Sequence, residues 1–358
     1  MGNLDEFNAL DDVILEIARD VKPLYYVNPC KDNELEQKER FLHGEVSEPV
    51  FEYKDVEYDT SGVEARLSAL DLPDHRLSGL YEKKIWQTIA ENSIIRSRGD
   101  KDLVRELSIG LHGRPSEGLV EHAENLLSTL PNTVSPKIVD AETIRYSLQQ
   151  GLQEEGLDDW SVELADKWLT TIYAPEKMMT VCRHRSFAEN DPERLKVHEV
   201  GVHALRAANG YEQPLKIFAL GVPGYLPTEE GLASYFEEIS GNSSDETMRD
   251  YAARVIAVDS VCNDMGFRET FDRLKDHELD DEKAWQLALR AHRGGGYVKD
   301  HVYLQGFMEV NDFAEDGGNL HRLYVGKVGL EDLSLVGELL EDGTLREPRY
   351  LPDILRRG

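Results

Sequence analysis

The chain has 358 residues, 40% of them hydrophobic, and carries a formal net charge of −29. This composition is typical of a folded protein and provides enough chain for one large domain or two ordinary ones. A field of this sign repels phosphate groups, so we do not expect nucleic acids or anionic membranes as partners.

The acidic residues are spread along the whole chain rather than gathered in a tail, and we interpret them as solvated helix faces. An even spread favours a halophilic source, in which multimolar salt shortens the Debye length to about 3 Å or less. An acidic protein from a low-salt organism is the alternative. The sequence has three cysteines, no run of about 18 apolar residues and no signal-peptide pattern. We therefore expect a cytoplasmic protein without a disulfide framework.

Apolar residues recur at helical spacing from the start of the chain and predict an amphipathic helix over residues 4–21. After the polar stretch NPCKDNELEQKE, the segment FLHGEVSEPVFEYKDVEYDTSG, which Pro49 interrupts, predicts a weak extended or loop region. Further helices are expected at 62–71, 78–96, 101–111, 115–131, 141–153 and 160–173. Residues 178–187 are the best strand candidate, because they form a short run rich in strand-forming residue types.

A long helix is predicted next, with Asp191 as its N-cap, Pro192 in its first turn and Gly210 at its end. Another helix begins near Thr228. Later helical patterns run on to about residue 292 and recur, after a break at 293–296, over 299–313 and 330–343. The predicted fold class is therefore α+β and mainly helical, with a helical region at 1–140 packed against a domain at 141–358.

The long helix carries His198, Glu199 and His203 in the sequence LKVHEVGVHALRAANG. Neutral histidine and carboxylate are the ligands that zinc takes in hydrolytic sites, where a fourth position stays open for water. Residues five apart on an α-helix lie about 140° apart around its axis, so the two rings would splay. A single π-bulge would bring them together, and Gly201 between them has no Cβ to resist it. The spacing predicts a metal site on a locally widened helix.

A third ligand is expected from the helix that begins near Thr228, where Glu229 and Glu230 are adjacent. The spacing alone does not separate these two carboxylates, and acids in a first turn also stabilise a helix without binding metal. Glu199 would lie beside the metal-bound water and accept its proton as a general base. The alternative reading is that the histidines have no metal at all.

Several separate motifs resemble one family. It comprises zinc peptidase-like proteins, whose bacterial members are named for a QEGLA motif and whose eukaryotic relatives are the tubulin tyrosine carboxypeptidases. The matching residues are His198-Glu199-Val200-Gly201-Val202-His203, Arg206, Asn209-Gly210 and Glu229-Glu230-Gly231-Leu232-Ala233. The stretch ALRAHRGGGYVKDHVYLQGF is similar to a later family segment, so the likeness covers roughly residues 20–325.

The resemblance implies a gluzincin-like fold in which His198, His203 and Glu230 bind zinc and Glu199 is the base. Glu229 stands where the bacterial name has Gln, a change expected to matter little if its side chain points to solvent.

A carboxypeptidase also needs a cation for the terminal carboxylate of its substrate. The candidates for this role are Arg206, Arg293 and Lys299. Tyr297 and Tyr303 are candidates for stabilising the tetrahedral oxyanion.

The leading functional prediction is a zinc-dependent carboxypeptidase that acts on peptide or protein C-termini. A metal amidohydrolase on a non-peptide amide would use the same chemistry, and a zinc-binding regulatory protein without turnover is the non-enzymatic alternative. Glu199 argues against the last, because a structural metal needs no free base. We do not transfer the tyrosine preference of the eukaryotic relatives, and the acidic surface argues against microtubules as a partner.

Overall fold

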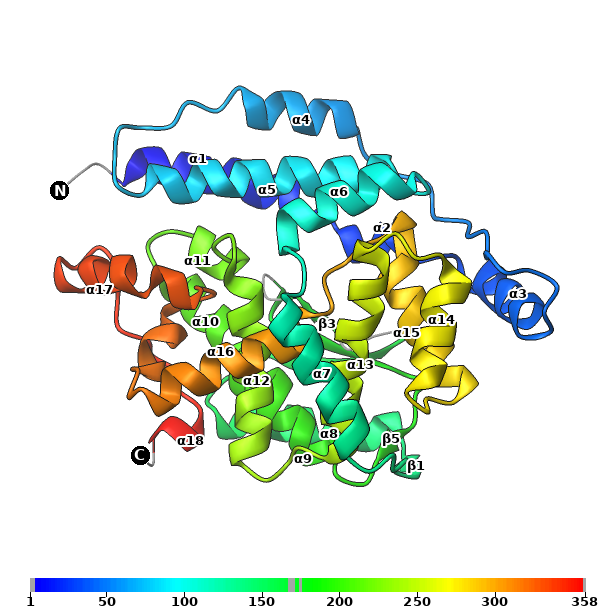
Figure 1. Cartoon of the computed structure of the whole chain (residues 1–358). Coiled ribbons are helices and arrows are strands. Elements are labelled where there is room, and N and C mark those ends of the chain that lie inside the picture. Colours follow the sequence, from blue (N-terminus) through cyan, green and yellow to red (C-terminus); the bar gives the residue numbers. More distant parts are fainter. Residues whose placement is uncertain (1–3, 167–170, 174–175, 357–358) are drawn as a thin grey trace. The chain divides into compact units, whose positions relative to one another are not determined.

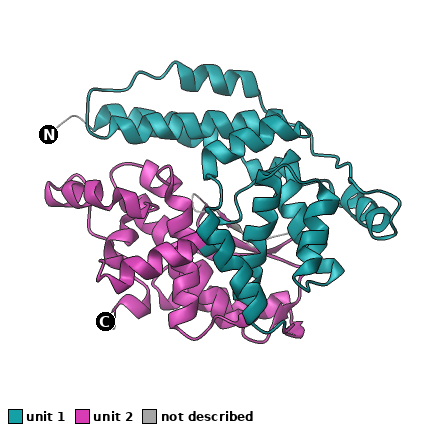
Figure 2. Ribbon diagram, in the orientation of Figure 1, with its two compact units in different colours: residues 1–132, 247–304 teal, residues 133–246, 305–358 magenta. Residues whose placement is uncertain are grey.

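The computed structural model describes residues 4–166, 171–173 and 176–356 (Figure 1). Most of them lie in helices and a minority in two small sheets, which confirms the mainly helical α+β class. The chain forms two compact units (Figure 2). Unit 1 comprises Met1–Asn132 and Thr247–Leu304, and unit 2 comprises Thr133–Glu246 and Gln305–Gly358. The chain thus leaves unit 1 near the boundary predicted at residue 140, but returns to it later.

Among the described residues of unit 1, the regular elements are helices, and one isolated β-bridge joins Pro29 to Tyr53. Its helices are α1 Asp5–Ala18, α2 Pro23–Val27, α3 Lys31–Leu42, α4 Thr60–Ser68, α5 Ser78–Arg96, α6 Lys101–His112, α7 Glu117–Thr129, most of α13 Asp245–Cys262, α14 Phe267–Asp276, α15 Asp281–His292 and the short 3₁₀ helix η3 Arg293–Gly295. Helix α5 packs against α4 and α6 (Figure 1). The predicted helices at 78–96 and 101–111 are confirmed almost to the residue.

Helix α3 occupies the polar stretch NPCKDNELEQKE, for which the sequence predicted no element. Its sequence carries little apolar surface, but the ring of Phe41 is fully buried among Phe267, Phe271 and Trp285, with centroid distances of 5.0–5.2 Å. Phe41 is the buried apolar residue of this helix, whereas Leu35 and Leu42 are exposed, so the sequence shows no apolar periodicity.

Unit 2 combines helices with both sheets. Its elements are β1 Lys137–Val139, α8 Ala141–Glu154, β2 Ser161–Ala165, β3 Thr171–Tyr173, β4 Met178–Cys182, β5 Phe187–Ala188, α9 Asp191–Leu195, the π-helix η2 Lys196–Ala204, α10 Leu205–Glu212, α11 Ile217–Leu220, α12 Tyr225–Ile239, most of α16 Val302–Glu315, the 3₁₀ helices η4 Leu320–Val325 and η5 Leu330–Asp332, α17 Leu333–Glu341 and α18 Asp353–Arg356. Within the described ranges, no helix is long and apolar enough to cross a membrane.

The prediction of a helix over 160–173 is wrong at 161–165 and 171–173, where β2 and β3 lie, and its residues 167–170 are outside the described ranges. Strand β2 runs parallel to β4, and β3 pairs antiparallel on its other side. The side chain of Gln149 in α8 donates to Trp160 O and accepts from Val162 N–H, each at 3.0 Å. These bonds hold the chain extended at the start of β2. The strand expected over 178–187 is confirmed at β4, and a two-stranded sheet joins β1 to β5.

The long predicted helix exists as the continuous series α9, η2 and α10, but both predicted ends are wrong. Asn190 is the N-cap residue, while the Asp191 carboxylate accepts from Ala188 N–H at 2.7 Å and pairs with Arg194. At the other end the helix passes through Gly210 to Glu212. Gly210 is needed for packing instead, because a Cβ there would overlap the backbone of α11.

Candidate metal centre

The two histidines of the motif lie on a stretch of true π-helix. Residues Lys196–Ala204 form η2, which confirms the widening predicted from the five-residue spacing. The ring centroids of His198 and His203 are 4.8 Å apart. In a plain α-helix the same residues would point about 140° apart, so the π-helix brings the two rings to one side.

Glu230 of α12 completes a group of three ligand side chains. Its Oε2 atom lies 3.7 Å from His198 Nε2 and 3.6 Å from His203 Nε2. The three ligand atoms lie within 4.8 Å of one another. Zinc bonded at its usual lengths in a tetrahedral site would separate such atoms by about 3.4 Å, so the residues fit a zinc ion with little movement.

Close packing brings α12 against its neighbours in unit 2. A Cβ on Gly231 would overlap the backbone of Gly306 in α16, and a Cβ on Gly306 would overlap Pro227. The glycine of the EEGLA motif therefore allows close helix contact directly beside the Glu230 ligand.

Each histidine is held from behind by a buried carboxylate. His198 Nδ1 bonds Glu237 Oε1 at 2.8 Å, and His203 Nδ1 bonds Glu229 Oε1 at 2.9 Å. An ionised carboxylate can only accept, so both Nδ1 atoms carry hydrogen and both Nε2 atoms are left to bind a metal. The sequence interpretation missed Glu237, although its position seven residues after Glu230 places it on the same helix face.

Glu229 corrects an expectation. We expected it to matter little on the premise that its side chain points to solvent, yet it is only 2% exposed and bonds His203, a candidate metal ligand. Arg206 pairs with it directly, and Lys327 Nζ lies 3.4 Å from its Oε1. Although burial alone would raise it, these two cations hold the pKa of Glu229 well below its usual range.

Arg206 is fully buried within unit 2. Its Nε donates to Leu323 O at 2.9 Å and to Gly326 O at 3.2 Å, while its Nη1 donates to Glu229. The guanidinium predicted to bind a substrate carboxylate is therefore committed to the protein's own groups, and its place is behind His203. Arg194 plays the corresponding part for Glu237, with Nη1 at 2.9 Å from Oε1.

The electrostatics of the centre favour a cation between the three ligands. Burial opposes protonation of His198, but the nearby carboxylates of Glu230 and Glu237 outweigh it and raise the pKa of His198 to about 10. The carboxylates around His198 thus favour positive charge at this centre. Glu199 follows His198 on η2 and is half-buried.

Comparison with known families decides the relationship. The family model for microtubule-associated tyrosine carboxypeptidase matches residues 39–358. The chain belongs to the microtubule-associated tyrosine carboxypeptidase family. This confirms the resemblance seen in the motifs.

The curated relatives of this family are long proteins. Microtubule-associated tyrosine carboxypeptidase 1 of Rattus norvegicus is 30% identical over 173 residues, which are 44% of this chain and 36% of the relative. The putative tyrosine carboxypeptidase MATCAP2 of Mus musculus is 30% identical over 168 residues, which are 44% of this chain and 32% of the relative. The matched stretch thus spans about a third of these curated relatives. No solved structure matches the chain.

The other predicted substrate residues of this family member, Arg293, Tyr297, Lys299 and Tyr303, belong to unit 1, whereas the three ligands belong to unit 2. Arg293 lies 5.6 Å from the Tyr297 ring centroid, and its Nη2 is 3.4 Å from Asp300 Oδ1. Lys299 Nζ lies 5.8 Å from the Tyr303 ring centroid. Their contact with a substrate stays a prediction.

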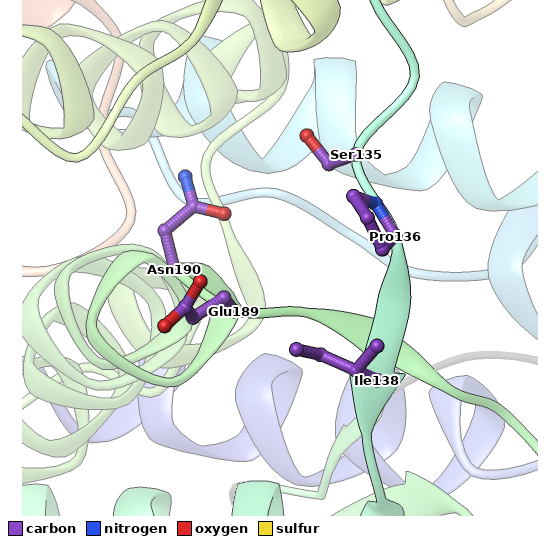
Figure 3. Close-up of a pocket in the computed structure, with 5 residues that line it drawn as sticks. All are labelled: Ser135, Pro136, Ile138, Glu189 and Asn190. Atoms are coloured by element: carbon purple, nitrogen blue, oxygen red, sulfur yellow. The ribbon is translucent and has the colours of Figure 1, made fainter.

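A cavity of about 370 Å³ lies elsewhere in unit 2 (Figure 3). It is lined by Ser135, Pro136, Ile138, Glu189 and Asn190, which come from β1 with its approach and from the β5–α9 connection. Its lining includes none of the three metal ligands, so we do not associate this cavity with the chemistry of the family.

Proposed function

We propose that this protein is a zinc-dependent metallopeptidase of the carboxypeptidase type, which hydrolyses the C-terminal peptide bond of peptides or proteins. The observation that carries the proposal is the convergence of His198 Nε2, His203 Nε2 and Glu230 Oε2 on one point. Two nitrogens and one carboxylate are the protein ligands of many catalytic zinc sites and leave a fourth position open. Membership of a family named for carboxypeptidase activity supports the same conclusion.

Each residue of the centre would have its own role in metal binding or hydrolysis. His198, His203 and Glu230 would hold the ion, and Glu229 and Glu237 would keep both imidazoles in the ligating tautomer. Zinc, when bound, supplies a Lewis acid that polarises the substrate carbonyl and acidifies a water. Glu199 would serve as the general base, which would take a proton from the attacking water and give it to the leaving amine.

Two sequence predictions stay proposals: that Arg293 and Lys299 recognise the terminal carboxylate of the substrate, and that Tyr297 or Tyr303 stabilises the oxyanion. A basic side chain suits a carboxylate because its hydrogen bonds are charge-assisted. Arg206 leaves this group because its donors support Glu229.

The remaining predictions stand as proposals too. They are a gluzincin-like arrangement with the third ligand on a following helix, a catalytic domain within 141–358, a cytoplasmic location and a halophilic source. The alternatives are a metal amidohydrolase on a non-peptide amide and a zinc-binding regulatory protein without turnover. A tyrosine at the substrate's C-terminus is one of several end groups to test.

The deciding experiment measures zinc by elemental analysis in high salt, on the wild type and on Glu230→Ala. We expect about one zinc per wild-type chain and a clear loss in the variant. Peptides with free and amidated C-termini are then compared as substrates. Cleavage that requires the free carboxylate supports the carboxypeptidase, cleavage of both points to another amidase, and zinc without any turnover supports the regulatory protein. A wild type that binds no zinc overturns the proposal.

A further inference from the structure

The π-helix that brings the histidines together takes from the Gly201 carbonyl its α-helical donor, Leu205 N–H. Each π-type bond joins an N–H to the carbonyl five residues earlier, whereas an α-type bond reaches back four. In an α-helix the carbonyl of Gly201 would accept from Leu205 N–H, four residues later. Here Leu205 N–H donates to Val200 O and Val202 O instead.

A tyrosine from η4 bonds that carbonyl. Tyr324 Oη donates to Gly201 O at 2.6 Å, and the tyrosine is fully buried within unit 2. Burial raises the pKa of Tyr324 well above its ordinary value, so the phenol keeps its proton and remains a donor. A buried carbonyl without a hydrogen bond destabilises the folded state. The bond from Tyr324 therefore stabilises the π-helical arrangement of η2.

The residues around Tyr324 hold the same site at two further points. The carbonyls of Leu323 and Gly326 accept from Arg206, and Lys327 lies 3.4 Å from Glu229. Lys327 N–H also donates to Phe218 O at 2.7 Å, which ties this stretch to α11. Residues 323–327 therefore contact the widened helix and also the groups that orient His203.

We propose that Tyr324 is a positioning residue that holds the π-helical register of η2 and thereby keeps His198 and His203 on one side of the helix. Without the Tyr324 hydroxyl, the buried Gly201 carbonyl loses this hydrogen bond as long as η2 stays π-helical. The α-helical arrangement, in which the two histidine rings splay, then becomes favourable. The part of this inference that concerns metal rests on the proposed function. The part that concerns the helix register does not.

The test uses Tyr324→Phe in the full chain, which removes the hydroxyl and keeps the ring. Amide hydrogen exchange of the segment 196–204 is measured by mass spectrometry in metal-free protein, and zinc dissociation constants are measured by competition with a chelator. We expect exchange in this segment to be faster by about fivefold or more, the lower end for a buried carbonyl that loses its donor. We expect zinc binding to weaken by about tenfold or more, the lower end for lost outer-shell support.

Tyr81→Phe is the matched control. Tyr81 is also fully buried and donates one hydrogen bond, to Asp11 Oδ1 at 2.8 Å, but it lies in unit 1. This variant should leave exchange at 196–204 and the zinc dissociation constant within twofold of the wild type.

The outcomes separate this inference from the proposed function. If Tyr324→Phe keeps the wild-type hydrogen exchange and zinc affinity, the inference about Tyr324 is wrong. It is also wrong if Tyr81→Phe changes both quantities as much as Tyr324→Phe does. Faster exchange with unchanged zinc affinity would overturn the link between the register and the ligands. A wild type that binds no zinc would overturn the proposed function, and the exchange result would then decide the role of Tyr324 by itself.

Discussion

Glu229 and His203 are joined by a hydrogen bond of 2.9 Å between the carboxylate Oε1 and the ring Nδ1. The bond fixes which ring nitrogen carries hydrogen and directs His203 Nε2 toward Glu230. Two cations, Arg206 and Lys327, keep the carboxylate ionised. The adjacent glutamates of the motif thus have different roles, since one is a candidate ligand and the other orients a ligand.

Replacing Glu229 should separate its hydrogen bond from its charge. In Glu229→Gln the amide oxygen can still accept from His203 Nδ1, so zinc affinity should fall less than in Glu229→Ala, for which we expect a loss of about 10- to 100-fold. Both variants leave Arg206 and Lys327 without their buried counter-charge. The free energy of unfolding should therefore drop by about 3 kcal/mol in each. Chelator competition and denaturant unfolding measure the two effects, and equal zinc affinities in the two variants would contradict this division.

Glu237 should matter for metal binding although no motif contains it. Glu237→Ala removes the partner of His198 Nδ1, and zinc should bind about 10- to 100-fold more weakly. Glu238→Ala is the matched control, because Glu238 is the next residue of α12 and is exposed. Indistinguishable zinc dissociation constants for the two variants would show that the carboxylate behind His198 does not support the site.

Glu199 should be required for turnover and dispensable for the metal. Glu199→Gln keeps the shape of the side chain but cannot accept the proton, so we expect peptide hydrolysis to slow by about 10²- to 10⁴-fold. Zinc stoichiometry should remain at the wild-type value. The exposed Glu193 of α9 provides the control substitution Glu193→Gln, which should leave the rate unchanged. If Glu199→Gln hydrolyses peptides at the wild-type rate, Glu199 is not the general base.

Gly231 should tolerate no side chain. In Gly231→Ala the new Cβ overlaps the backbone of Gly306, so α12 and α16 must move apart. We expect unfolding to become easier by about 3 kcal/mol, the upper end for overpacking, and zinc binding to weaken because Glu230 is the adjacent residue. Gly118→Ala in α7 is the contrasting variant, since nothing lies within 4 Å of its new Cβ. There the lost chain entropy of glycine should stabilise the protein by about 0.5–1 kcal/mol. Denaturant unfolding of both variants gives the comparison.

Local patterns were sufficient for much of this protein. The helix at 78–96 follows from its own sequence, and the spacing of His198 and His203 predicted a π-helix because both residues lie on one element. The choice of Glu230 over Glu229 needed the family motif. The helix predicted over 160–173 is wrong because the bond from Val162 N–H to Gln149 and the pairing with β4 hold β2 in an extended conformation. A short apolar run in the sequence reveals neither contact.

The sequence by itself determined the types of ligand, their spacing and the need for a widened helix, since helix geometry relates neighbours along the chain. Only the tertiary structure decided what holds them. Glu237 lies 39 residues from His198, and Tyr324 lies 123 residues from Gly201. A hydrogen bond between residues so far apart leaves no periodicity in the sequence. It exists because packing places one donor against one buried acceptor that water cannot reach.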